Sequence, residues 1–185
     1  MINRKFFFDQ VRSTLFGGQL RTAQVDGLTT ILDVWELGLA KKDDRWLAYM
    51  LATTHHETDR TMQPIEEYGK GRGKPYGKPD AQTGQIYYGR GFVQLTWDYN
   101  YRKMAKVAGA DLLNHPELAL ELPIATKILF FGMTSGSFTG KKLADYFAPG
   151  IDDWRNARRI INGLDKAELV ADYGHRYYAA VSYTT

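Results

Sequence analysis

Three glutamates in the first half of the sequence are candidates for acid–base chemistry. Glu57 ends the segment RWLAYMLATTHHE, and Glu66 and Glu67 follow it in MQPIEEYG. A positioned glutamate can give a proton to a reacting group or take one from it, which is a common source of enzymatic rate enhancement. The chain therefore offers one isolated carboxylate and, shortly after it, an adjacent pair.

Glu57 is predicted to lie on the core-facing side of a helix that runs from Arg45. At about 100° per residue, Glu57 projects within roughly 20° of Trp46 and Met50 on the apolar stripe. A carboxylic acid held against apolar surface is disfavoured in its charged form, so its pKa rises and it suits the role of a general acid. The alternative is a glutamate that turns to solvent at the helix end, and the stripe alone leaves both possibilities open.

The chain beyond the glutamate pair changes from a loop to a run of polar and aromatic residues. The loop, GKGRGKPYGKPDAQTGQ, has neither a helical nor a strand period, and YYGRGFVQLTWDYNY follows it. Carboxylates, a loop and then a polar, aromatic wall form the order expected of a cleft that cleaves glycosidic bonds. Ordinary roles are also open, since Thr96 could cap the next helix. In this run Gln94, Thr96, Tyr99 and Asn100 offer hydrogen-bond donors, acceptors and a stacking ring.

Several of these segments together resemble the family 19 glycoside hydrolases. The matching stretches are HHET, YYGRGFVQLTWDYNY and the later RRIING, and they extend from about Arg45 to about Gly163. QLTWDYNY is the most specific of them because it combines several polar and aromatic positions. The family includes the class I and II chitinases and many phage and bacterial endolysins. The first segments, FFFDQVRSTLFGG and QVDGLTTILDVWE, resemble its phage-type branch.

The resemblance implies specific roles for individual residues. Glu57 would protonate the leaving oxygen, one of the paired glutamates would act as the base, and Thr96 would hold the attacking water, with inversion at the anomeric carbon. Asp98 stands where the family usually has asparagine. Asn162 would bind substrate, although an asparagine there could also end a helix. Including Asn162, the expected substrate-binding residues are Tyr88, Gln94, Tyr99, Asn100 and Asn162.

The choice between Glu66 and Glu67 as the base depends on the local backbone. Pro64 disfavours helical geometry at the residue before it, so the segment is predicted to be extended. Neighbours in an extended chain point to opposite sides, and Ile65 is the residue most expected to turn inward. This favours Glu67 as the base. If the segment were helical, Glu66 would be equally suitable.

The sequence predicts one mainly α catalytic domain over residues 1–185, without a separate wall-binding domain. We expect a lysozyme-like, two-lobed helical fold with a small β element near residues 85–93. The apolar residues Phe7, Val11 and Leu15 recur at helical spacing before Gly17. Further helices are expected at 24–37, 99–107, 124–133, 154–161 and 167–181.

Composition and missing motifs exclude several kinds of site. There is no cysteine, which excludes disulfides and thiolate zinc sites. HHE is not the H-E-x-x-H zinc pattern, and G-x-S-x-G is missing, so neither a metal site nor a serine nucleophile is expected. No cofactor is expected. Lys70, Arg72, Lys74 and Lys78 make the glycine-rich loop basic, but no nucleic-acid motif surrounds them.

The expected substrate is peptidoglycan, cleaved by an endolysin of the muramidase type that acts as a monomer. The net charge of +3 suits an anionic wall, although many proteins without such a partner share it. The sequence has no signal-peptide core and no run of about 20 apolar residues for stable membrane insertion. We therefore expect synthesis in the cytoplasm and release to the wall by a helper such as a holin. The alternatives are a chitinase acting on chitin and a non-catalytic carbohydrate-binding protein on the same fold.

Overall fold

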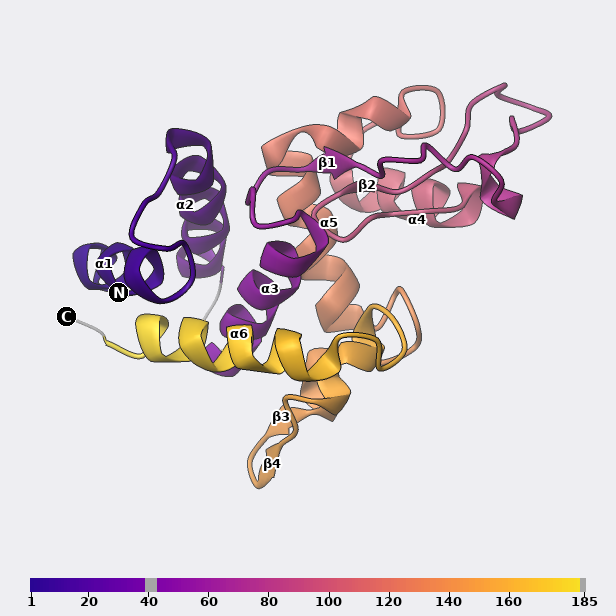
Figure 1. The fold of residues 1–185 in the computed structure, drawn as a ribbon. Helices are drawn as coiled ribbons and strands as arrows, with labels where there is room; N and C mark the ends of the chain where they lie inside the picture. Colours follow the sequence, from indigo (N-terminus) through magenta and orange to yellow (C-terminus); the bar gives the residue numbers. More distant parts are fainter. Residues whose placement is uncertain (39–42, 184–185) are drawn as a thin grey trace.

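Helices make up most of the computed structural model, which describes residues 1–38 and 43–183. The mainly α fold is therefore confirmed. Figure 1 shows α1, α2 and α6 gathered on one side, α4 with a small sheet on the other, and α3 and α5 between them. The six α-helices of the described residues are α1 (Arg4–Thr14), α2 (Thr22–Leu37), α3 (Asp44–Glu57), α4 (Asp98–Ala108), α5 (Leu122–Ser135) and α6 (Ala167–Val181).

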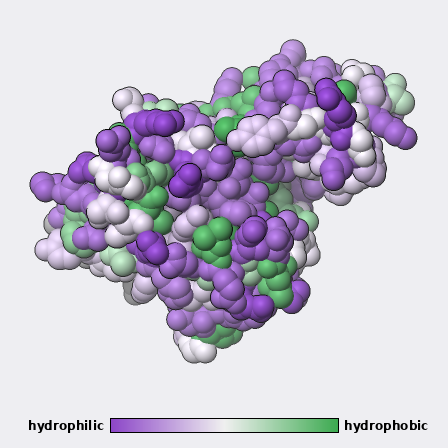
Figure 2. Space-filling view, in the orientation of Figure 1, coloured by the Kyte–Doolittle hydropathy of each residue, from purple (hydrophilic) through white to green (hydrophobic). Residues whose placement is uncertain are grey.

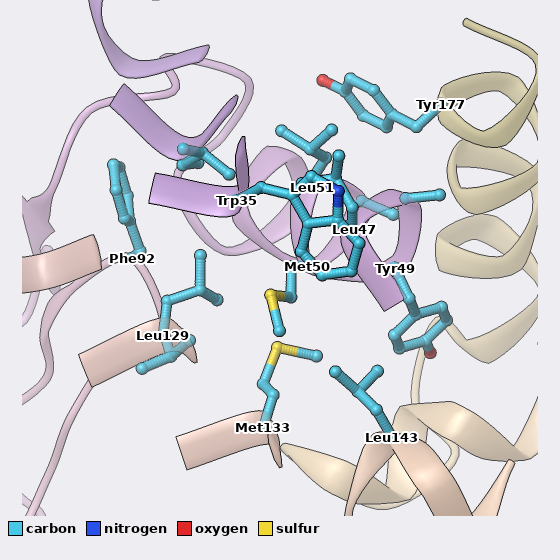
Figure 3. Close-up of a cluster of buried hydrophobic side chains, with 14 of the residues drawn as sticks. Trp35, Leu47, Tyr49, Met50, Leu51, Phe92, Leu129, Met133, Leu143 and Tyr177 are labelled. Carbon is cyan, nitrogen blue, oxygen red and sulfur yellow. The ribbon is translucent and has the colours of Figure 1, made fainter. Parts of the chain in front are cut away.

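The central helix, α3, carries much of the core. Its residues from Leu47 to His55 are all buried, and its most extensive packing is against α6. Figure 3 shows Met50 of α3 facing Met133 of α5, with Tyr177 of α6 on the other side of the helix. Gly174 of α6 admits the indole of Trp154, because a Cβ there would lie 2.7 Å from its Cε3. A helix buried on several sides can hold its final residue in a fixed place.

The two ends of α3 are set by local hydrogen bonds. Asp43 caps the start, because its carboxylate accepts the backbone N–H of Arg45 at 3.0 Å. At the other end, the Thr58 hydroxyl donates to the carbonyl of Thr54. Asp59 and Arg60 then take positive φ angles of 48° and 64°, which end the helix directly after Glu57.

The predicted β element is present but very short. Strand β1 (Ile65–Glu66) pairs antiparallel with β2 (Arg90–Gly91), so that Glu66 stands opposite Arg90. The strand ends there because Gly91 has a φ of 87° and the chain turns. The antiparallel hairpin of β3 (Phe147–Ala148) and β4 (Ile151–Asp152) was not predicted.

The helical segment predicted for residues 154–161 is present but shorter than predicted. The chain forms only a short 3-10 helix, η4 (Asn156–Ile160). The Asp153 carboxylate accepts the backbone N–H of Asn156, and Ile161 donates to the carbonyl of Arg158, a bond of the tighter i to i+3 kind. The remaining 3-10 helices are η1 (Pro75–Gly77), η2 (Pro116–Leu120) and η3 (Leu143–Asp145).

The surface shown in Figure 2 is mainly hydrophilic, with small and separate hydrophobic areas. Among the described residues, no helix combines the length and the apolar character needed to cross a bilayer.

Candidate active site

Glu57 lies at the end of α3 and points inward, with 16% of its side chain exposed. The solvent-turned alternative is therefore wrong. The expected apolar surroundings are also wrong, because Arg158 Nη1 donates to Glu57 Oε1 at 2.6 Å. The Arg158 side chain is only 3% exposed, and its Nε donates to the carbonyl of Asp165 at 3.0 Å. Glu57 is thus fixed by a buried guanidinium that arrives from η4.

Sequence reasoning missed Arg158, although it lies in the RRIING stretch. Arg158 and its neighbour Arg159 both lie between Ala157 and Ile160, and only the structure shows that Arg158 is the buried one. A basic residue at a buried position requires a partner of opposite charge. The sequence alone does not say which carboxylate, among residues far away along the chain, that partner is.

Three side chains, one from β2 and two from the segments outside the sheet, favour the ionised form of Glu66. The Tyr88 hydroxyl donates to its Oε1 at 2.5 Å, and the Lys70 ammonium lies 2.9 Å from its Oε2. Arg90 Nε lies 3.7 Å from Oε1, which is an ion pair but too long for a hydrogen bond. The hydrogen bond from Tyr88, followed by that from Lys70, lowers the pKa of Glu66 below its ordinary value. With 31% of its side chain exposed, this carboxylate remains accessible to water.

Glu67 is held mainly by backbone groups. Its Oε1 accepts the N–H of Gly71 at 2.5 Å, and its Oε2 accepts the N–H of Gly89 and the Tyr76 hydroxyl, both at 3.2 Å. Its own N–H donates to the carbonyl of Gly89 at 2.8 Å. Glu67 therefore ties the glycine-rich loop to the segment before β2.

The predicted extended backbone at the glutamate pair is confirmed, since Ile65 and Glu66 form β1. Glu66 and Glu67 accordingly use different partners on different sides of the chain. Both carboxylates are engaged by protein groups, so the alternation of sides does not by itself identify the base.

Gln94 and Thr96 form a tight turn between β2 and α4. Gln94 has a φ of 53°, and its Nε2 donates to the carbonyl of Ile65 at 3.1 Å. The Thr96 hydroxyl donates to the carbonyl of Gln94 at 2.7 Å. Thr96 does not cap α4, because the N-cap is Trp97, without a side-chain cap bond. A hydroxyl that donates to a carbonyl keeps its oxygen available as an acceptor.

The remaining predicted binding residues differ in their exposure. Tyr99 is 58% exposed and free to contact a ligand, whereas Tyr88 is 8% exposed and its hydroxyl is used by Glu66. Asn100 Nδ2 donates to the carbonyl of Thr96. Asn162 is exposed just after η4, and its Oδ1 accepts the N–H of Gly163.

The two histidines before Glu57 differ in their surroundings. His55 is fully buried, and its Nδ1 lies 3.0 Å from the Tyr177 hydroxyl. Burial lowers the pKa of His55 to about 3, so the ring is neutral at physiological pH. Burial is also the main cause that lowers the pKa of His56. Within residues 1–38 and 43–183, no cluster of three or more His, Cys, Asp or Glu side chains could hold a metal ion.

Replacement of Arg158 by Met should destabilise the fold strongly. The change leaves Glu57 without its charged partner, and removing one member of a buried ion pair costs about 3–5 kcal/mol. Urea unfolding measures the loss. Arg159→Met is the matched control: Arg159 is exposed, and its Nε lies 3.4 Å from Asn156 Oδ1, so its effect should stay within about 0.5 kcal/mol. Equal stability of the two variants would contradict the importance of the pair.

Comparisons with known proteins agree with this fold and identify the family of the chain. The chitinase class I family model matches residues 37–142, more than half of the chain. A basic endochitinase of Vitis vinifera is 38% identical over 109 residues, 50% of this chain and 35% of that protein. An endochitinase of Persea americana is 35% identical over 146 residues, 64% of this chain and 45% of that protein. The chain thus spans less than half the length of these two relatives.

Solved structures share the fold at low sequence identity. Chitinase C of Streptomyces griseus has a TM-score of 0.61 at 22% identity, covering 100% of this chain and 78% of that chain. A class IV chitinase of family 19 from Zea mays has a TM-score of 0.63 at 17% identity, covering 100% of this chain and 96% of that one. The family match covers the predicted acid, the glutamate pair and the turn before α4. The chain belongs to glycoside hydrolase family 19, the chitinase class I family.

Proposed function

We propose that this protein hydrolyses β-1,4 bonds between N-acetyl sugars by an inverting mechanism that uses two carboxylates. The observation that carries the proposal is that Glu57 and Glu66 are each held by a largely buried arginine, Arg158 and Arg90 respectively. Both glutamates lie within the part of the chain that matches the family. In inverting enzymes one carboxylic acid protonates the leaving oxygen and the other carboxylate activates a water.

Glu57 is the proposed acid. Its Oε1 is occupied by Arg158, while no residue of the described chain donates a hydrogen bond to its Oε2. Oε2 is therefore the oxygen available to carry the proton to the leaving group. Arg158 prevents rotation of the carboxyl group, and such positioning is worth a large part of a catalytic barrier.

Glu66 is the proposed base. This differs from the sequence prediction, in which the alternation of side chains along an extended chain favours Glu67. Glu66 is bound by side chains only, and it remains partly exposed to water. Glu67 is instead used by the backbone of the loop, through Gly71 and Gly89. Thr96 supports the base in this proposal, since its oxygen can accept a hydrogen bond from the attacking water.

Glu57→Gln should reduce hydrolysis at least ~100-fold, the low end for removal of a general acid. The amide keeps an oxygen that can accept from Arg158 but carries no acidic proton. Release of reducing ends from an N-acetyl sugar oligomer measures the loss, and circular dichroism verifies the fold. Near-native turnover in a folded variant would remove Glu57 from the mechanism.

The two neighbouring glutamates are distinguished by Glu66→Gln and Glu67→Gln. Glu66→Gln should lose activity in a protein that circular dichroism shows to be folded. Glu67→Gln should keep the chemistry but weaken the loop, because an amide can no longer accept three bonds as a carboxylate does. An active Glu66→Gln beside a folded but inactive Glu67→Gln would reverse the assignment. Full activity in both would exclude a base at this pair.

Tyr88→Phe should shift the acid limb of the pH profile. The hydrogen bond from Tyr88 is the largest cause that lowers the pKa of Glu66, so its removal raises that pKa. A base works only when ionised, so kcat/KM should begin to fall at a higher pH than in the original protein. The profile is measured between pH ~3 and ~7, which spans ordinary carboxylate values. An unmoved acid limb would indicate that Glu66 is not the base.

For the natural substrate we propose peptidoglycan, with chitin as the second candidate. The basic balance of the chain supports the anionic wall, whereas the names of the relatives, endochitinases, support chitin. Loss of turbidity of purified walls, compared with release of reducing ends from chitin oligomers, separates the two. An endolysin role with release by a holin is part of the same proposal. Binding of either polymer without any cleavage would instead support a carbohydrate-binding protein.

A further inference from the structure

A small pocket with aromatic walls is lined by residues that adjoin Glu67 and Thr96. It has a volume of about 140 Å³, and its walls include Tyr76, Tyr87 and Trp97. The Tyr76 hydroxyl bonds to Glu67, and Trp97 directly follows Thr96. Pockets for whole small molecules measure roughly 300–1,000 Å³, so this one suits a single group of a larger ligand.

The pocket is built before any ligand arrives. Gly71 and Gly77 touch so closely that a Cβ on Gly77 would lie 1.7 Å from the Gly71 carbonyl oxygen, which fixes the turn that carries Tyr76. Trp97 has a φ of 75°, a costly conformation for a residue with a Cβ, and remains 37% exposed. Its ring lies edge-on to the Tyr76 ring, with 5.4 Å between the ring centroids. The strained backbone therefore presents the indole to the pocket rather than to the core.

The same pocket holds a cation and a carboxylate that have no partner among the described residues. Lys78, Asp80 and Asp98 line it. The Asp80 carboxylate already has partners, because its Oδ1 accepts hydrogen bonds from the backbone N–H groups of Gln82 and Thr83. In the part of the chain that the structure describes, the side chains of Lys78 and Asp98 form no hydrogen bond or ion pair, either with each other or with other residues.

We infer that this pocket binds an amino-acid group that carries both an ammonium and a carboxylate, as found on the peptide stems of peptidoglycan. Asp98 would accept from the ammonium and Lys78 would donate to the carboxylate, while the aromatic walls cover the carbon skeleton. A neutral sugar would desolvate both charges without pairing either, which is unfavourable. The inference rests on the proposed function and assigns its substrate to the peptide-bearing wall.

The test compares hydrolysis of two forms of the same substrate. One is purified peptidoglycan, and the other is peptidoglycan whose stem peptides have been removed by an amidase. Lys78→Gln and Asp98→Asn should each lower kcat/KM on the peptide-bearing form about tenfold, the low end for losing a hydrogen bond between charged groups. Both variants should retain the original rate on the stripped form. Lys103→Gln and Glu121→Gln, at exposed positions outside the pocket, make the same charge changes and should act like the original protein on both forms.

The outcomes separate the two proposals. Cleavage of both forms by the original protein at equal kcat/KM, with unchanged rates in both pocket variants, would overturn the peptide-binding inference and leave the hydrolase intact. A parallel loss on both forms would also overturn it, because the pocket would then serve the sugar chain. No cleavage of either form, or of chitin oligomers, by the original protein would overturn the proposed function itself.

Discussion

The contact between Arg158 and Glu57 joins parts of the chain that are distant in sequence. It connects the end of α3 to η4, and through the Asp165 carbonyl it also fixes the turn that leads into α6. The Arg158 side chain is only 3% exposed, so its guanidinium has lost nearly all of its hydration. The free-energy cost of this desolvation must be offset by a charged partner and by hydrogen bonds. The most extensive helix packing in the described chain, between α3 and α6, brings these ends together.

The second carboxylate, Glu66, is likewise paired with a largely buried arginine, Arg90 of the small sheet. Arg90 is 6% exposed, and its Cζ lies 3.6 Å from the centre of the Tyr88 ring. Its Nη1 donates to the Tyr101 hydroxyl at 3.0 Å. That hydroxyl in turn donates to the carbonyl of Tyr88. The network leaves the Tyr88 phenol pointing at Glu66. Each carboxylate of the proposed pair is therefore positioned by a largely buried arginine, Glu57 by Arg158 of η4 and Glu66 by Arg90 of β2.

Local pattern was sufficient to predict most of the helices. The apolar stripe predicted α3, although by itself it left the direction of Glu57 open, and α6 was predicted with its observed limits, Ala167–Val181. The failures came where local bonds or distant contacts compete with periodicity. At η4 the Asp153 carboxylate tightens the turn into a 3-10 helix. Trp97 could not be predicted to expose its ring, because nothing in a sequence reports a positive φ at a residue other than glycine.

The site was predictable in its residue types but not in its partners. Alternation along the extended chain separated Glu66 from Glu67, yet it could not say which side faces the cleft. That depends on Tyr88 and Gly89, which approach from another segment. The position of Glu57 at the end of a helix was predictable, whereas its contact with Arg158 spans 101 positions of sequence. Long-range pairing of this kind is decided by packing and leaves no periodic signal.

The central claim is that two carboxylates act on opposite faces of a sugar ring, one as an acid and one through water. The stereochemistry of the first product tests this most directly. Proton NMR of a fresh digest of a β-1,4-linked N-acetyl sugar oligomer reports the anomer before it equilibrates in solution. The account predicts that the α-anomer forms first, because water attacks the face opposite the departing group. Initial formation of the β-anomer would contradict it, since retention requires a carboxylate nucleophile instead of a base.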